Sequence, residues 1–338
     1  MIDTFLRMTI AVHGVAQAGE VEEAAAEAQE PAQGPSSRFL LVAVGLYIFS
    51  TTAFLIWRGI SVSPDYLLIM LLLAAIVLGR WKAFLVDWLP FVALFLGYEF
   101  LRGIANVSGI PAHYSGVIAA DRFLGFGEVP TIWLQHHLYT PGRVGFLEYA
   151  ATIVYFCHFA YPLGLGYLFW IKDRVLFRRF AAALLGMSFC AFIFYLLVPV
   201  GPPWLAAEKG YLPHVEKIIA HTMQNYTSWV YHRFNPNEVA AMPSLHAAFP
   251  TLGLLYATRA FGRKAWILAL WCLVVWFAIV YMGEHYLIDV LAGVATAVTA
   301  FTITEVTWSR LSRRRSGPGQ TGQAQPRGYA LQTVDVQE

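Results

Sequence analysis

The stretch Ala240–Pro250, "AAMPSLHAAFP", stands directly before an apolar run that ends near residue 261. Pro243 suits the first position of a helix, where backbone N–H groups have no partners within the helix. Those N–H groups and the positive end of the helix dipole attract anions such as phosphate. The stretch therefore predicts a helix that presents Ser244 and His246 to an anion, although a helix-start hydrogen bond alone accounts for the serine.

The composition around this stretch is that of a polytopic membrane protein. Of the 338 residues, 58% are hydrophobic and 13% are charged, whereas soluble proteins carry roughly 25% charged residues. The formal net charge of +2 argues against a nucleic-acid partner. A spanning helix needs about 20 apolar residues. The expected fold class is all-α, with about eight transmembrane helices over 39–57, 64–79, 83–101, 146–171, 177–198, 244–261, 264–282 and 286–307.

Basic residues cluster in every second loop, which predicts the orientation of the chain in the plasma membrane. All of these loops and both termini then lie in the cytoplasm, and the long loops 102–145 and 199–243 face outward. The expected divisions are a disordered cytoplasmic tail over 1–38, N-terminal spans over 39–101, a membrane domain carrying the motifs over 102–309, and a basic and then disordered tail over 310–338.

A second motif, "GEHYLIDVLAG", places His285 and Asp289 four residues apart at the start of the last span. On a helix this spacing puts the two side chains nearly on one face. A carboxylate that accepts from one imidazole nitrogen fixes the tautomer and leaves the other nitrogen as a nucleophile or base. A structural His–Asp bond is the alternative. Because both motifs begin spans on the outer side, His246 and His285 are expected to face each other across one cavity.

The outer loops contain candidate cations for binding phosphate, and they also contain a segment that is expected to form a short helix. Arginine binds phosphate in bidentate fashion, and Arg102, Arg122 and Arg233 are candidates, although most loop cations are simply solvated. Pro130 predicts the start of a helix that lies either on the outer leaflet or against the bundle. The three cysteines form no CxxC pair and the histidines form no metal-ligand spacing, so neither a metal nor another cofactor is expected.

The motifs "PSLHAA" and "GEHYLIDVLAG" resemble the second and third signatures of the type 2 phosphatidic acid phosphatase superfamily. The stretches "PVGPPW" and "DRFLGFGEVPTIWLQ" are most similar to its inositol phosphorylceramide synthase branch. The resemblance implies that His285 is the nucleophile, that Asp289 orients it, that His246 is the general acid, and that no metal takes part. The Lys-x6-Arg-Pro signature of the phosphatases is absent, and Ile279 stands where they carry an arginine.

These patterns predict a membrane enzyme that acts on lipid phosphate esters through a phosphohistidine at the extracytoplasmic face. The expected reaction is transfer of a phospho-head group of the inositol phosphate type between lipid or polyol acceptors, and the expected lipid substrate is a phospholipid or a polyprenyl phosphate. Simple hydrolysis of phosphatidic acid or polyprenyl phosphate is an alternative within the class. A proton-coupled transporter that uses the His and Asp residues as a relay and a serine hydrolase built on Ser244 with His285 are the rivals from other classes.

Overall fold

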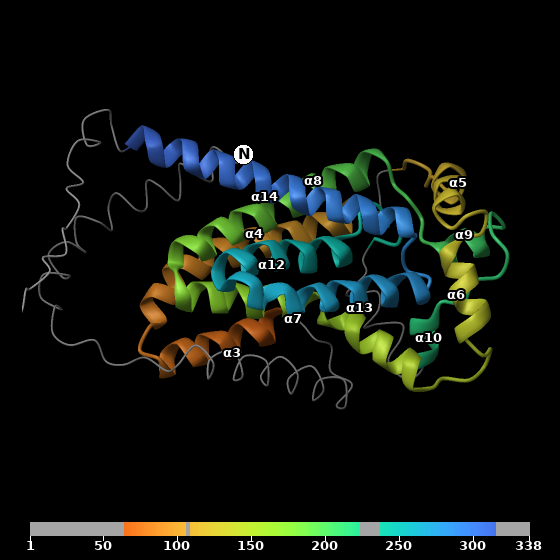
Figure 1. Ribbon diagram of the computed structural model, residues 1–338, viewed down its shortest axis with the longest axis horizontal. Helices are drawn as coiled ribbons and strands as arrows, with labels where there is room; N and C mark the ends of the chain where they lie inside the picture. Colours follow the sequence, from red (N-terminus) through yellow and green to blue (C-terminus); the bar gives the residue numbers. More distant parts are fainter. Residues whose placement is uncertain (1–63, 106–108, 224–236, 316–338) are drawn as a thin grey trace, which may run out of the picture.

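The computed structural model describes residues 64–105, 109–223 and 237–315, which form a helical bundle (Figure 1). The expected span 39–57 and the two tails lie outside the described residues, apart from the beginning of the basic segment at 310–315. The helices are α3 (Pro64–Val77), α4 (Trp81–Ala105), α5 (Ser115–Leu124), α6 (Pro130–Leu138), α7 (Phe146–Lys172), α8 (Arg174–Leu197), α9 (Pro203–Glu208), α10 (Ile218–Thr222), α12 (Leu245–Phe261), the 3-10 helix η1 (Gly262–Trp266), α13 (Ile267–Tyr281) and α14 (Leu287–Arg315).

Fewer spans meet the length and composition of a membrane-crossing helix than the sequence suggested. Four helical stretches of the described residues qualify, or five if the two halves of α7, which meet at 49°, count as one span. The expected span 64–79 forms α3, whose 14 residues reach only about 21 Å of a hydrocarbon core about 30 Å thick. The qualifying stretches are Trp81–Tyr98, Arg174–Leu197, Leu245–Tyr281 and Leu287–Arg313, with α7 as the fifth. The protein is a helical membrane protein, and its described residues, which exclude the expected span 39–57, supply four or five such stretches.

The stretch Leu245–Tyr281 counts as one candidate span, although two were expected there. It contains α12 and α13, which have 17 and 15 residues. The two helices lie side by side, with η1 as the turn between them (Figure 1). Gly262, at φ 62°, opens this turn in a backbone conformation that glycine adopts without strain.

The basic turns gather at one end of the bundle, on the left in Figure 1. The guanidinium of Arg80 donates to the carbonyl of Ile171 at 3.3 Å, which ties the α3–α4 turn to the end of α7. Arg179 of α8 and Arg259 of α12 both pair with Glu305 of α14. The segments that the charge pattern assigned to one side are therefore neighbours. Which side faces the cytoplasm stays a prediction.

A buried carboxylate fastens the same end. Asp87 of α4 is 8% exposed and accepts from the indole N–H of Trp170 at 2.8 Å. It also pairs with Arg174 at 2.6 Å and with Arg178 at 2.8 Å. Because a buried charge is stable only when it is paired and hydrogen-bonded, this cluster fixes α4 against α7 and α8.

The opposite end carries α5, α6, α9 and α10, and the starts of α12 and α14 point toward it (Figure 1). Helix α6 is the short helix expected after Pro130. Its buried Gln135 donates to the carbonyls of Glu216 and Tyr281, each at 2.9 Å, so the helix packs on the bundle. Trp133 and Leu138 are exposed on it, and their placement in the outer leaflet stays a prediction.

Helices α12 and α14 approach each other closely at Gly293. A Cβ atom on this residue would lie 2.2 Å from the backbone carbonyl oxygen of Ser244. The glycine of "DVLAG" therefore allows the first turn of α14 to lie beside the start of α12, which brings the two histidine motifs together.

Candidate active site

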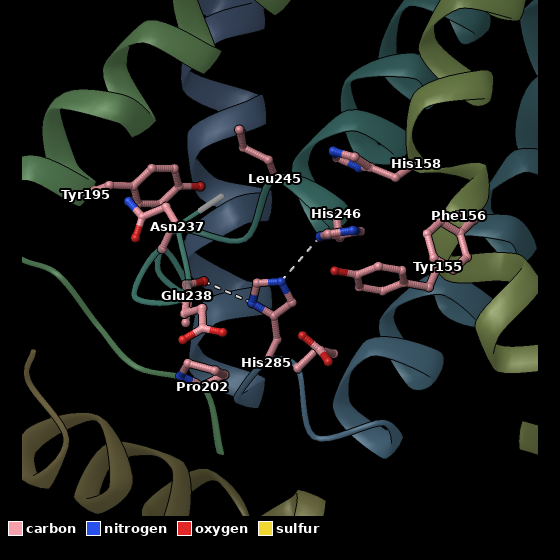
Figure 2. A pocket seen from close by; sticks show the side chains of 13 residues that line it. Tyr155, Phe156, His158, Tyr195, Pro202, Asn237, Glu238, Leu245, His246 and His285 are labelled. Atoms are coloured by element: carbon pink, nitrogen blue, oxygen red, sulfur yellow. Dashed lines mark hydrogen bonds between the residues drawn. The ribbon is translucent and has the colours of Figure 1, made fainter. Parts of the chain in front are cut away.

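A cavity of about 50 Å³ lies where the two histidine motifs meet (Figure 2). Helix α7 forms one wall, the start of α12 forms another, and the loop before α12 lies opposite α7. The described residues that line it are Tyr155, Phe156, His158, Tyr195, Pro202, Asn237, Glu238, Ala240, Ala241, Leu245, His246, Glu284 and His285. The volume holds a few water molecules or one phosphate group, so a whole lipid cannot enter.

His285 stands two residues before α14, and its ring is held by the backbone of the facing loop. Its Nδ1 lies 2.9 Å from the carbonyl oxygen of Ala241. A carbonyl only accepts, so Nδ1 carries the proton and the lone pair of the neutral ring is on Nε2. That Nε2 lies 3.4 Å from Nδ1 of His246 (Figure 2). The expectation that the two histidines share one cavity is met.

Asp289 lies near His285, but it is not the closest partner of the ring. Its Oδ2 is 3.6 Å from Nδ1 of His285, beyond hydrogen-bond length, and accepts from the backbone N–H of Tyr286 at 2.9 Å. The carbonyl of Ala241 thus makes the hydrogen bond that was expected from the carboxylate, and Asp289 forms an ion pair with the same ring nitrogen. In the first turn of α14 the carboxylate bonds a backbone donor that lacks a helical partner, and the ring turns to Ala241. The aspartate still supplies a buried negative charge beside the ring.

His246 is held among aromatic rings of α7. Its ring stacks on Tyr155 with centroids 4.3 Å apart and lies 4.0 Å from the ring of His158. His158 in turn stacks on Phe249 at 4.5 Å. The sequence interpretation missed His158, although an ionisable residue inside the apolar run "FCHFAYP" is a signal for a site in a membrane protein.

The proline-rich stretch after α8 closes the cavity and fixes the acceptor of His285. Pro202 lines the cavity, and the N–H of Trp204 donates to the carbonyl of Gly283 at 3.2 Å. The backbone of Val200 exchanges bonds with Val239 and Ala241, at 2.9 and 3.0 Å. The stretch thus does more than end a helix, because it sets the position of the Ala241 carbonyl.

Ser244 caps α12 and does not line the cavity. Its hydroxyl accepts from the N–H of Ala247 at 3.3 Å, and the side chain is fully buried. The helix begins at Leu245, so Pro243 stands before the cap and not at the first helical position. The structure thus favours the helix-start hydrogen bond over phosphate binding for this serine.

Of the three expected phosphate-binding arginines, Arg122 is the one whose side chain is described, and it does not line the cavity. Arg122 is exposed on α5 and is absent from the lining, while the side chain of Arg102 and the whole of Arg233 lie outside the described residues. The charged residues of the described lining other than histidine are Glu238 and Glu284. Among described residues no cluster of three metal-ligand side chains is present, and independence of a metal stays a prediction.

Lys217 lies outside the described lining but interacts electrostatically with two of its acidic residues. Its ammonium lies 3.4 Å from the centroid of the Trp204 ring. Burial lowers the pKa of Lys217, and the charges of Glu284 and Glu238 oppose that shift. The lysine therefore offsets acidic residues of the cavity from outside its wall.

Asp121 of α5 ties the outer helices to the site. It is fully buried, and its Oδ1 accepts from the N–H of Ile288 at 2.9 Å. This bond satisfies a first-turn donor of α14, three residues after His285. Burial raises the pKa of Asp121 to about 6, and nearby Asp289 adds to the shift. The role of "ADRFLG" in the site was not visible from spacing, because the partner is a backbone group 167 residues away.

The bundle, the facing histidines and the helix starts define a class of membrane phosphoryl-transfer proteins. Residues 115–303, more than half of the chain, match the PAP2 superfamily, and the chain belongs to that family. The resemblance seen in the two motifs is confirmed. The protein is accordingly a membrane phosphatase or phosphotransferase of this superfamily.

One curated relative indicates which branch of the superfamily the chain is similar to. The chain is 26% identical over 240 residues to a phosphoinositol dihydroceramide synthase of Bacteroides thetaiotaomicron, a match that covers 64% of this chain and 75% of the relative. No solved structure matches the chain. The relative agrees with the similarity to the inositol phosphorylceramide synthase branch.

Proposed function

We propose that this protein transfers a phospho-head group of the inositol phosphate type to a lipid or polyol hydroxyl, through a phosphohistidine on His285. The observation that carries the proposal is the pair of imidazole nitrogens, Nε2 of His285 and Nδ1 of His246, 3.4 Å apart at the start of two membrane helices. The name of the relative supports the choice of head group.

The proposed chemistry assigns one task to each histidine. The Nε2 lone pair of His285 attacks phosphorus while the bond from phosphorus to the leaving oxygen breaks, and His246 gives its proton to that oxygen. In the second half-reaction a hydroxyl attacks phosphorus, His246 takes its proton, and the P–N bond breaks. Asp289 stabilises the positive charge that develops on His285. The two rings are in contact, so an entering phosphoryl group must part them.

The proposed site faces the extracytoplasmic side of the plasma membrane. Its cavity accommodates a phosphoryl group, and the rest of the lipid then stays in the bilayer beside the helix starts. Phospholipid and polyprenyl phosphate are both compatible with this arrangement. The choice between transfer and hydrolysis depends on whether a hydroxyl or water attacks the phosphohistidine.

The test is rapid-quench labelling of purified protein in detergent with labelled lipid phosphates and phosphodiesters, at neutral to alkaline pH where phosphohistidine survives. Wild-type protein is expected to form a burst of labelled enzyme, and His285→Ala is expected to form none. His246→Ala is expected to keep the burst with a nitrophenyl phosphate ester, whose leaving group needs little protonation.

Two results would change the assignment. Undiminished labelling of His285→Ala would remove the nucleophile's role from His285, and covalent capture of Ser244 by a fluorophosphonate would support the serine hydrolase. Release of free phosphate with no new lipid product, in the presence of polyol and lipid acceptors, would identify a hydrolase.

A further inference from the structure

Asn237 is a buried amide at the cavity wall, and its orientation is fixed. It is 2% exposed and lines the cavity from the loop before α12, across from Tyr155 and Phe156 in Figure 2. Its side-chain oxygen accepts from the backbone N–H of Val239 at 3.1 Å. An N–H donor requires the oxygen at that position, so the amide nitrogen is the atom that remains available to another group.

Within the part of the chain that the structure describes, that nitrogen has no acceptor. Nδ2 of Asn237 is buried and makes no hydrogen bond, although buried polar groups are nearly always hydrogen-bonded. Gln135, another buried side-chain amide nearby, provides the contrast. Its nitrogen donates to two carbonyls and its oxygen accepts from the N–H of Glu216 at 2.9 Å. The amide of Gln135 is structural, whereas half of the Asn237 amide is unused by the fold.

The cavity as described lacks the cation that a phosphoryl group usually meets. His246 and His285 are assigned to the chemistry, His158 stacks on Phe249, and the other charged residues of the described lining are Glu238 and Glu284. The amide nitrogen of Asn237 is therefore a neutral donor in a wall that also carries two acidic residues. A neutral donor at a buried site still stabilises an oxyanion strongly, because the bond is charge-assisted and shielded from water.

We propose that Asn237 is a substrate-binding residue whose amide nitrogen donates to a non-bridging phosphoryl oxygen of the lipid phosphate. This inference rests on the proposed function of the site. It assigns to an uncharged side chain part of the task that the arginines of the phosphatase signatures perform.

The decisive variant is Asn237→Asp, with Asn237→Ala and Asn237→Ser beside it. Aspartate has the same shape and keeps an oxygen for the N–H of Val239, but it turns an oxygen toward the cavity in place of the donor. Binding of inorganic phosphate to purified protein is measured by calorimetry, and kcat and KM are measured with a lipid phosphate. Thermal unfolding in detergent verifies that each variant is folded, and Gln135→Glu serves as a control for adding a carboxylate to a structural amide.

We expect Asn237→Asp to weaken phosphate binding at least tenfold and to lower kcat/KM by about 100- to 1,000-fold, as for loss of an oxyanion donor. Asn237→Ala and Asn237→Ser should fall between aspartate and wild type. A purely structural role would instead lower the unfolding temperature and leave the phosphate affinity of the folded fraction unchanged.

Three outcomes would overturn the inference. They are equal phosphate binding by wild type and Asn237→Asp, no phosphate binding by wild type, and an unchanged kcat/KM in Asn237→Asp. Tighter inhibition of Asn237→Asp by free myo-inositol would show that the amide meets a hydroxyl instead, because a carboxylate accepts from hydroxyls and repels phosphate. Phosphate binding by wild type without any phosphohistidine would count against the proposed function and leave the Asn237 contact standing.

Discussion

Replacing Asp121 by asparagine should change how the stability of the protein depends on pH. Asparagine keeps an oxygen for the N–H of Ile288 but carries no charge. The pKa of Asp121 rises from 3.8 in the unfolded chain to about 6 in the fold. Because folding raises this pKa, its contribution to stability is complete below pH 3.8 and is lost as the pH rises through about 6.

The size of the effect follows from the shift. About two pKa units correspond to about 3 kcal/mol of stability lost at pH 8. Roughly half of this is already lost at pH 5, so the wild type should lose on the order of 1 kcal/mol more than Asp121→Asn between pH 5 and pH 8. The comparison of two pH values removes any effect of the asparagine amide that does not depend on pH, such as the cost of burying its unpaired N–H donor.

The assay is thermal unfolding in detergent, followed by circular dichroism, at pH 5 and pH 8 for both proteins. The unfolding temperature of the wild type should fall more across this interval than that of the variant, by a few degrees. Parallel pH dependence in the two proteins would show that the carboxylate is not buried as described. Asp121→Ala, which removes the acceptor, should be less stable than Asp121→Asn at both pH values.

Three further results are expected. Ser244→Ala should cost about 1 kcal/mol of stability and lower activity less than tenfold; a 100-fold loss of activity in a stable variant would restore the serine to phosphate binding. Gly293→Ala should lower phosphohistidine formation by about 100-fold, because its methyl group must push α12 from α14 and small displacements in a site are costly; normal labelling would contradict the close approach. In a chain without native cysteines, an impermeant maleimide applied to intact cells should label cysteine at exposed Lys209 and spare Arg263, and the reverse pattern would place the site in the cytoplasm.

The sequence predicted the elements of the site better than their contacts. The starts of α12 and α14 were both expected, because long apolar runs, with proline and serine before the first and a His–Asp motif before the second, are local signals. The meeting of His246 and His285 followed from placing both starts on one side. The family resemblance then supplied roles that spacing alone leaves open.

What the sequence could not predict depends on packing between distant segments. The partner of the His285 ring is a carbonyl 44 residues away, and that of Asp121 is a backbone N–H. Asn237 carries no motif, and its unused donor is visible only once its neighbours are placed. The charge of Arg122 made it a candidate. A single sequence does not indicate, however, in which direction a helix of a loop points its side chains.

The His285 ring donates to a main-chain carbonyl, that of Ala241, so no substitution of a side chain removes the acceptor itself. Any side chain that fits at this buried position leaves the carbonyl in place. The activities of variants at residue 241 would therefore report only how large a side chain the position accepts. A mutational scan would credit Asp289 with the whole task of orienting the nucleophile. An ester in place of the amide between residues 241 and 242, which weakens the Ala241 carbonyl as an acceptor, would reveal the share that belongs to the main chain.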